Sequence, residues 1–320
     1  LLTGEHAAAQ RMAGTAFIIR VASAGVVFLS QILLARWMGS FEYGSYVYVW
    51  TWLLLIGDIV HLGLPLTAQK FIPEYNQRGA MDLLRGYIYG SRWLTFSIGT
   101  LIALGGAGLI RMLEGSLSQN VAMPLYLACV ALPFYAFSFM LDGIARSNNW
   151  ISLAVMPHSL LRPILILGMI GAGFALGHKF DATGAMLVTV IAVWATSLGQ
   201  LVVLNRRLAE TVAPGAKIYD IKGWFAASLP MIAVWGIYTL LTTTDVLILQ
   251  QFRPSDEVAR YYAASKTLTL VTFVYFAVSA SAGHRFTAYH VAGDRDGLAN
   301  FVSQTIRWIF RSEEHTSELQ

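Results

Sequence analysis

Long apolar stretches alternate with short polar segments along almost the whole chain. Each stretch holds roughly 20 or more mainly apolar residues, which is the length an α-helix needs to cross a bilayer, and is about twice what a transmembrane β-strand needs. The expected spans are 13–37, 45–66, 87–110, 122–145, 151–177, 184–204, 225–250 and 261–283, and a ninth is expected to begin near Phe301. The pattern predicts an all-α integral membrane protein with about eight complete transmembrane helices.

Composition agrees with this fold class and excludes others. The chain is 56% hydrophobic and 12% charged, whereas soluble domains carry roughly 25% charged residues. Its 22 Lys and Arg residues form no dense basic run, so we expect no nucleic-acid partner. Cys129 is the only cysteine, and no phosphate-binding glycine loop, HExxH pattern or Cys/His cluster occurs. We therefore expect no cofactor, no metal site and no ATP-driven pump.

Positive residues predict the orientation. Under the expected topology one side holds Arg11, Lys70, Arg78, Arg85, Arg146, Arg206, Arg207, Lys217, Lys222, Arg285 and Arg295. The opposite loops hold only Arg36, Arg111, Lys179 and Arg253, with Arg260 at the edge of the eighth span. Because Lys and Arg concentrate in cytoplasmic loops, we expect a multi-pass membrane protein with a cytoplasmic N-terminus.

A weak internal repeat suggests two lobes. Residues 32–46 resemble residues 246–261 at an offset of 214, with a one-residue slip, and the offset recurs for the pairs Tyr75/Tyr289 and Asp82/Asp296. Six spans per repeat keep the direction of the chain, so the repeats would be parallel, as in two-lobed transporters with a site between the lobes. We predict a six-helix lobe over 1–205 and the first part of a second lobe over 206–310. Convergent hydrophobic sequence is the alternative.

The last ten residues, RSEEHTSELQ at 311–320, break with the apolar text before them. They resemble a translated sequencing adapter, so we expect a non-native tail and a truncated second lobe.

An ordered set of residues follows the first span and continues into the inner segment. Its members are Leu34, Ala35, Arg36, Gly39, Glu42, Tyr43, Gly44, Tyr46, Gly63, Leu64, Glu74 and Tyr75, and the junction 245–266 adds to them. Over nearly all of residues 11–300 this set resembles the polysaccharide flippases (O-antigen or oligosaccharide, Wzx-type) of the MOP exporter superfamily. We expect Gly39 and Gly44 to permit a tight outer turn, and the tyrosines to mark the membrane interface.

Charges inside the spans are the candidate site residues, because an intramembrane charge normally faces a cavity or a partner. Arg20 and Asp58 are expected at one depth, with His61 one turn from Asp58, and Asp245 and Lys266 at another. Each pair is either an ion pair that holds a hairpin together or part of a functional cavity.

Arg162 lies near the middle of the fifth span, flanked by Pro157, His158 and Pro163. Prolines there free backbone carbonyls, which Arg162 would bind if its role were structural. His158 and His61 are either proton-coupling residues or packing residues. Arg92 and Asp142 lie near span ends, where such side chains can reach the interface.

The resemblance implies a flippase that moves an undecaprenyl-diphosphate-linked oligosaccharide across the bacterial inner membrane by alternating access. Arg20, Arg162 and Lys266 would then line a cationic cavity, since arginine forks bind phosphate. The expected partners are the lipid-linked oligosaccharide, membrane lipid and other polysaccharide assembly proteins. The alternatives are a multidrug or lipid II exporter of the same superfamily, or a polysaccharide polymerase or ligase, which would need a large external loop.

Overall fold

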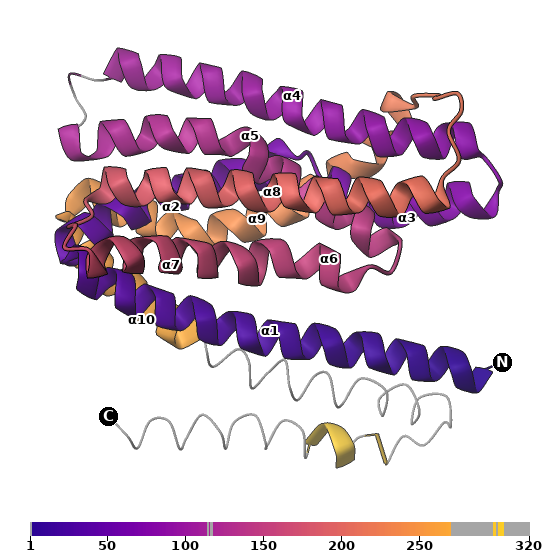
Figure 1. Cartoon of the computed structure of the whole chain (residues 1–320), viewed down its shortest axis with the longest axis horizontal. Coiled ribbons are helices and arrows are strands. Elements are labelled where there is room, and N and C mark those ends of the chain that lie inside the picture. The colour runs from indigo at the N-terminus through magenta and orange to yellow at the C-terminus, as the bar shows by residue number, and fades with distance from the viewer. Residues whose placement is uncertain (1, 114, 116–117, 270–296, 299, 304–320) are drawn as a thin grey trace. The chain divides into compact units, whose positions relative to one another are not determined.

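The computed structural model describes residues 2–113, 115, 118–269, 297–298 and 300–303, without the side chains of residues 2–18, 20, 119 and 269. The chain forms two compact units, Leu1–Tyr262 and Ala263–Gln320. The helices are α1 Leu2–Met38, α2 Ser40–Val60, α3 Leu64–Gln77, α4 Met81–Leu113, α5 Gln119–Ser147, α6 Ile151–Met156, the π-helix η1 Pro157–Leu161, α7 Arg162–Ala175, α8 Ala182–Thr211, α9 Ile221–Phe252 and α10 Ser255–Thr269 (Figure 1).

The prediction of an all-α membrane protein is confirmed. Every element in the described part of the chain is helical, and seven helical segments there are long and apolar enough to cross a membrane. The predicted eighth span, 261–283, begins in α10 and continues outside the described residues, as does most of the predicted ninth. The chain is a multi-pass membrane protein.

The predicted second span, 45–66, lies within the segment Ser40–Gln77 and the third, 87–110, within Met81–Leu113, but the segment between the two spans differs from the prediction. The helix breaks at residues 61–63, where Leu62 and Gly63 have φ of 51° and 67°, and α3 begins at Leu64. Residues 67–86, expected as a polar inner segment, form most of α3 and the start of α4. The physical reason is an amphipathic face: Phe71, Ile72 and Tyr75 recur at helical spacing and are buried.

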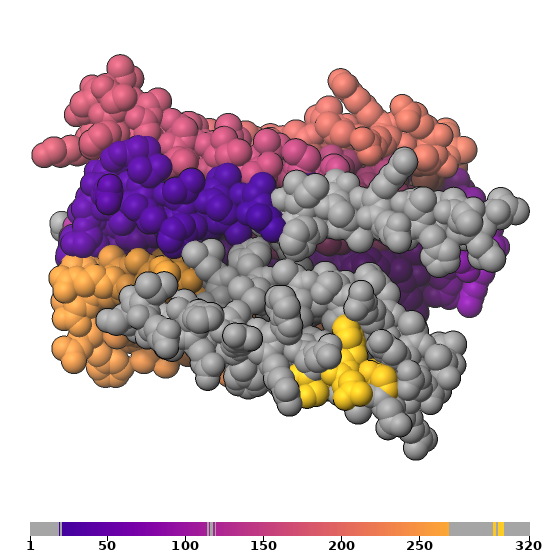
Figure 2. Space-filling model, turned by 90° about the horizontal axis from the view of Figure 1, so that it is seen from below, coloured from indigo at the N-terminus to yellow at the C-terminus, as the bar shows by residue number. Residues whose placement is uncertain are grey.

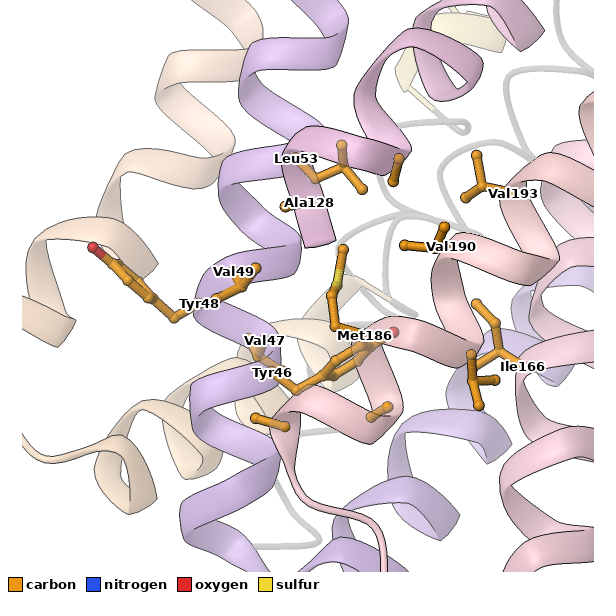
Figure 3. Packing of buried hydrophobic residues seen from close by; sticks show 14 of the residues in the cluster. Tyr46, Val47, Tyr48, Val49, Leu53, Ala128, Ile166, Met186, Val190 and Val193 are labelled. Atoms are coloured by element: carbon orange, nitrogen blue, oxygen red, sulfur yellow. The ribbon is translucent and has the colours of Figure 1, made fainter. Parts of the chain in front are cut away.

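Helix α5 is the central element of the first unit, because it packs against α2, α3, α4 and α8. Figure 1 shows α4, α5 and α8 running along one another. Between α2 and α8 the core is filled by interlocking apolar side chains such as Leu53, Met186 and Val190 (Figure 3). A second cluster joins α3, α4 and α5 around residues such as Ile72, Tyr87 and Met140.

The loops divide between the two ends of the helices. Residues 78–80, 148–150 and 212–220 connect helices at one end, and residues 176–181 connect them at the other. Figure 2 shows loops 176–181 and 212–220 at opposite ends. We call the end with residues 78–80, 148–150 and 212–220 the basic end. In or next to its loops lie Arg78, Arg85, Arg206, Arg207, Lys217 and Lys222.

Helix junctions recur at the offset of the predicted repeat. Helix α1 ends at Met38 and α9 at Phe252, 214 residues later, while α2 begins at Ser40 and α10 at Ser255, 215 residues later. This recurrence supports the repeat and its one-residue slip. The division into lobes near residue 205 stays a prediction.

Candidate functional site

Arg162 begins α7 immediately after the π-helical turn η1. Its backbone N–H donates to the carbonyl of Pro157, five residues earlier, so the helix is locally widened. Widened turns of this kind are frequent at functional sites. The turn arises at Pro157, since proline has no N–H with which to continue the α-helical ladder.

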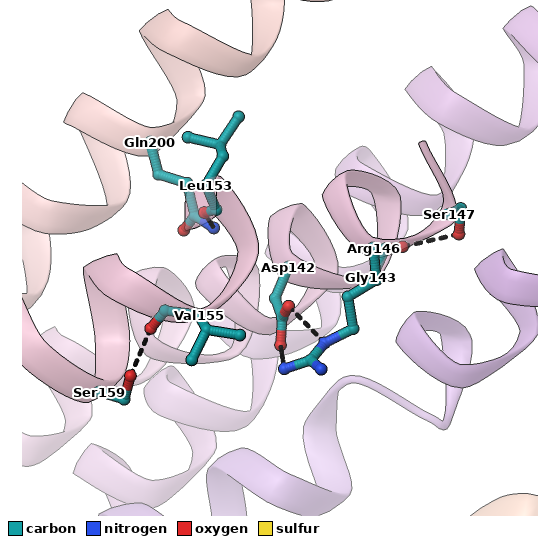
Figure 4. Close-up of polar contacts among 8 residues, drawn as sticks. All are labelled: Asp142, Gly143, Arg146, Ser147, Leu153, Val155, Ser159 and Gln200. Carbon is teal, nitrogen blue, oxygen red and sulfur yellow. Dashed lines mark hydrogen bonds and ion pairs between the residues drawn. The ribbon is translucent and has the colours of Figure 1, made fainter. Parts of the chain in front are cut away.

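The carbonyl that Pro157 leaves free is bound by another helix. Leu153 lies four residues before Pro157, and its carbonyl accepts a hydrogen bond from Nε2 of Gln200 on α8 at 3.0 Å. Figure 4 shows Gln200 reaching Leu153 beside the ion pair of Asp142 and Arg146. Sequence reasoning expected freed carbonyls here but proposed Arg162 as their structural partner. For Leu153 that partner is Gln200, a residue the sequence analysis missed because its polar group carries no charge.

The guanidinium of Arg162 is enclosed by α5. The residue is 4% exposed, its Nη2 donates to Oγ of Ser138 at 3.0 Å, and its central carbon lies 5.1 Å from the ring centroid of Tyr135. Ser138 is held in place because its hydroxyl also donates to the carbonyl of Tyr135 at 2.7 Å.

Arg162 nevertheless keeps unused binding capacity. Its Nε has no hydrogen-bond partner among the described residues, and none of the ion pairs found there includes Arg162. A buried charge without an opposite charge is costly unless a ligand or a function requires it. The arrangement can therefore accept an anionic group.

The two candidate histidines both pack against one aromatic ring. The ring of Phe139 lies 5.7 Å from that of His61 and 5.8 Å from that of His158, centroid to centroid. His61 is buried, and its Nδ1 accepts a hydrogen bond from the N–H of Gly63 at 3.2 Å. Both histidines thus make packing contacts with Phe139. Their role in coupling stays a prediction.

Asp58 faces α9. Its Oδ2 accepts a hydrogen bond from Oγ1 of Thr239 at 3.1 Å. The side chain of Arg20 lies outside the description, so the predicted pair of Arg20 and Asp58 stays a prediction. The neighbouring Gly57 faces α5 instead: a Cβ there would lie 2.3 Å from the ring of Tyr135. Helix α2 thus links the surroundings of Arg162 to α9.

Asp245 accepts a hydrogen bond from the hydroxyl of Tyr261 at 2.6 Å. Lys266 belongs to the other compact unit, beyond Tyr262. The predicted pair of Asp245 and Lys266, and the place of Lys266 in a cavity, therefore stay predictions.

The motif residues after the first span make structural contacts. Tyr43 donates to Gln31, the hydroxyls of Tyr46 and Thr189 lie 3.1 Å apart, and a carboxylate oxygen of Glu42 accepts the N–H of Ala182 at 2.8 Å. Figure 3 shows Tyr46 and Tyr48 leaving α2 in opposite directions, and Tyr48 accepts a hydrogen bond from Gln251 of α9 at 3.3 Å.

The expected role of the two motif glycines is only half right. Gly39 forms the turn, with φ of 85°. Gly44 lies inside α2, where a Cβ would be 1.7 Å from the backbone carbonyl oxygen of Ser255. It therefore permits the close approach of α2 to the start of α10, and plays no part in the turn itself.

The family model described as polysaccharide biosynthesis protein matches residues 12–282. The chain belongs to this family. The match covers all the candidate site residues. No curated protein and no solved structure matches the chain. As a member of the polysaccharide biosynthesis family with seven described helical segments able to span a bilayer, the chain is a membrane protein of polysaccharide biosynthesis.

Proposed function

We propose that the protein moves an undecaprenyl-diphosphate-linked oligosaccharide across a bacterial inner membrane. The observation that carries the proposal is the buried guanidinium of Arg162, which has an unused Nε–H and no ion pair within the described part of a membrane protein of this family. A diphosphate supplies the missing negative charge, because guanidinium and phosphate match in geometry and charge.

In the proposed mechanism two lobes rock about the site and expose it to each side in turn, while the lipid tail stays in the bilayer. The basic end faces the cytoplasm, with the N-terminus on the same side. The hydrogen bond of Asp58 and Thr239 and the close contact of Gly44 and Ser255 tie α2 to α9 and α10. These contacts must rearrange if α9 and α10 move with a second lobe.

A polymerase or ligase is the less favoured function. Such an enzyme acts on substrate outside the membrane and needs a substantial external loop. At the end opposite the basic end, the connections between the described helices are short: residue 39, residues 114–118, residues 176–181 and residues 253–254. A multidrug exporter is also less favoured. The buried residue with an unused hydrogen-bond donor near the middle of the fifth span is Arg162, which is a cation.

The test is complementation of a bacterial strain that lacks its own flippase and depends on this protein for surface glycan. Arg162→Ala removes a charge-assisted hydrogen bond worth about 1.5–3 kcal/mol, so we expect surface glycan to fall by about tenfold or more while the amount of protein in the membrane holds. Arg162→Lys restores the charge but not the fork, and should rescue partially.

Two control variants accompany this test. Arg78→Ala changes an exposed arginine at the basic end that pairs with Glu74, and should leave glycan unchanged. Ser138→Ala removes the positioning hydrogen bond alone, and should have a smaller effect than Arg162→Ala. Full rescue by Arg162→Ala at normal protein level would remove Arg162 from the site.

A further inference from the structure

A cavity of about 870 Å³ lies away from Arg162, between α4 and α8 near the basic end. Two phenylalanines of α5, Phe134 and Phe137, form its inner wall, and residues 212–215 and Lys217 of the α8–α9 loop lie at its edge. Its charged lining residues are Arg85, Arg92 and Lys217, and no carboxylate lines it. The cavity therefore carries an uncompensated positive charge.

Arg92 is the group in this cavity with unused capacity. It is 6% exposed, and its Nη1 donates to Oδ1 of Asn205 at 2.7 Å. Its Nε and Nη2 have no acceptor in the part of the chain that the structure describes. These two donors form one edge of the guanidinium, of the kind that binds a phosphate through two parallel hydrogen bonds. Both atoms are buried, so Arg92 must turn toward the cavity to present this edge to a ligand. Sequence reasoning missed this site, because it expected Arg92 to reach the interface.

The two other cations have different roles. Arg85 is committed to the loop: its Nε and Nη1 donate to the carbonyls of Ala216 and Ala213 at 2.8 and 3.0 Å, and its Nη2 bonds Asp82. Lys217 is exposed, with Nζ 4.0 Å from the ring centroid of Tyr89. Lys217 is thus placed at the mouth, where it can add a second positive charge for an anion bound at Arg92.

The rest of the lining is apolar and aromatic. The ring of Phe96 lies 5.3 Å from that of Phe134 and 5.9 Å from that of Phe137, in edge-to-face contacts. Trp93, next to Arg92 in the sequence, is 69% exposed on α4, a helix long and apolar enough to span the bilayer. Aromatic side chains next to basic ones are typical of the membrane interface. The cavity therefore combines a cationic group with apolar walls on membrane-spanning helices.

We infer that this cavity binds an anionic phospholipid, whose phosphate lies beside Lys217 and meets the Nε–Nη2 edge of Arg92 when that side chain turns toward the cavity, with an acyl chain against Trp93 and Phe96. A glycan headgroup fits poorly, since Asn205 is the one amide side chain in the lining and its oxygen already binds Arg92. A zwitterionic headgroup fits poorly too, because no lining carboxylate meets its ammonium group and Lys217 lies over the ring of Tyr89. The inference does not depend on the proposed transport.

The bound lipid would stabilise the α8–α9 loop, which connects the two predicted lobes. The loop is already held at α4 by Arg85 and by the hydrogen bond from the N–H of Ile218 to the carbonyl of Asp82 at 3.0 Å. Lys217 of this loop lies at the mouth of the cavity, and Arg92 belongs to α4. A lipid phosphate held between these two residues therefore adds another contact between the loop and α4.

The test measures the thermal stability and native mass spectra of the purified full-length protein in detergent, with phosphatidylglycerol, phosphatidylcholine, inorganic phosphate or undecaprenyl diphosphate added. We expect phosphatidylglycerol to raise the melting temperature and to stay bound in the spectrum, with little effect of phosphatidylcholine or inorganic phosphate. In Arg92→Gln the apparent affinity for phosphatidylglycerol should fall by about tenfold or more, because two charge-assisted hydrogen bonds are lost.

Two milder variants keep the test decisive if Arg92→Gln does not fold. Lys217→Gln changes an exposed loop residue and Trp93→Ala an exposed aromatic one, and each should weaken binding several-fold. Arg78→Gln, an exposed arginine at the same end, should leave it unchanged. The inference would be overturned if phosphatidylcholine or inorganic phosphate raised the melting temperature as much as phosphatidylglycerol does. It would also be overturned if undecaprenyl diphosphate bound more strongly than phosphatidylglycerol. Binding of phosphatidylglycerol undiminished in all three cavity variants would also overturn it.

Discussion

At the scale of single residues, the chemistry of a buried polar side chain in this membrane protein depends on which groups the neighbouring helices place around it. Arg162 and Arg92 are both buried arginines, yet their surroundings differ. Arg162 is surrounded by a hydroxyl and an aromatic ring of α5, whereas Arg92 lines a cavity and has two buried donors without an acceptor among the described residues. The same side chain therefore has different chemistry at the two positions, because each neighbouring helix contributes different acceptors.

Gly44 offers a prediction at this scale. In Gly44→Ala the new Cβ would lie 1.7 Å from a backbone oxygen at Ser255, so α2 must separate from the start of α10. Overpacking of this kind costs roughly 1–3 kcal/mol, and we expect a lower melting temperature for the purified protein. Gly105→Ala in α4, where a Cβ meets no atom within 4 Å, is the matched control. Equal melting temperatures for the two variants would contradict the close contact.

At the scale of elements, the fifth span is one apolar segment in the sequence but three helical pieces in the structure, α6, η1 and α7. The prolines signal an interruption, since Pro157 cannot donate to Leu153. A carbonyl that is freed inside the membrane must find a hydrogen-bond donor within the protein. Gln200 of α8 supplies that donor, and the membrane-spanning helix therefore tolerates the interruption.

This exchange of partners can be measured with a double-mutant cycle. Gln200→Ala leaves the carbonyl of Leu153 without a partner, and should lower stability by about 1–3 kcal/mol. In a Pro157→Ala background the restored N–H can bind Leu153, so the same Gln200→Ala change should cost much less. The free energies of unfolding of the four proteins give the coupling. Equal costs in both backgrounds would show that Gln200 does not compensate for Pro157.

At the scale of the whole molecule, charge divides the helical bundle into two ends. Basic residues gather near loops 78–80 and 212–220, and fewer of them, Arg36, Arg111, Lys179 and Arg253, lie in or next to the connections at the opposite end. By the charge rule for membrane topology, we propose that the basic end faces the cytoplasm. All the loops on which this orientation rests belong to the compact unit Leu1–Tyr262.

Thiol labelling in intact cells tests this orientation. In a Cys129→Ser background we expect His178→Cys, in an exposed loop opposite the basic end, to react with a membrane-impermeant maleimide. Gln77→Cys, exposed at the end of α3, should react only after permeabilisation. The cysteine-free background is the control, and the reverse labelling pattern would show that the N-terminus is on the other side.

The sequence anticipated the spans better than the contacts. It predicted apolar helices near α2, α4, α5, α8 and α9, and it identified Arg162 as a buried charge. It did not predict that α3 is a helix, because a short amphipathic pattern with two prolines resembles a polar loop. It also placed Arg92 at the interface, because depth along one helix does not reveal that α8 and α5 enclose the side chain.

The sequence by itself determined that this is an all-α membrane protein, because the length of an apolar stretch is a local property and the bilayer requires each span to satisfy its own backbone. It also showed which polar residues enter the membrane. Only the tertiary structure decided what those residues bind: Ser138 and Tyr135 for Arg162, Thr239 for Asp58, and Asn205 for Arg92. Partners of this kind come from helices distant in the sequence, so their choice depends on packing between helices, which no local pattern encodes.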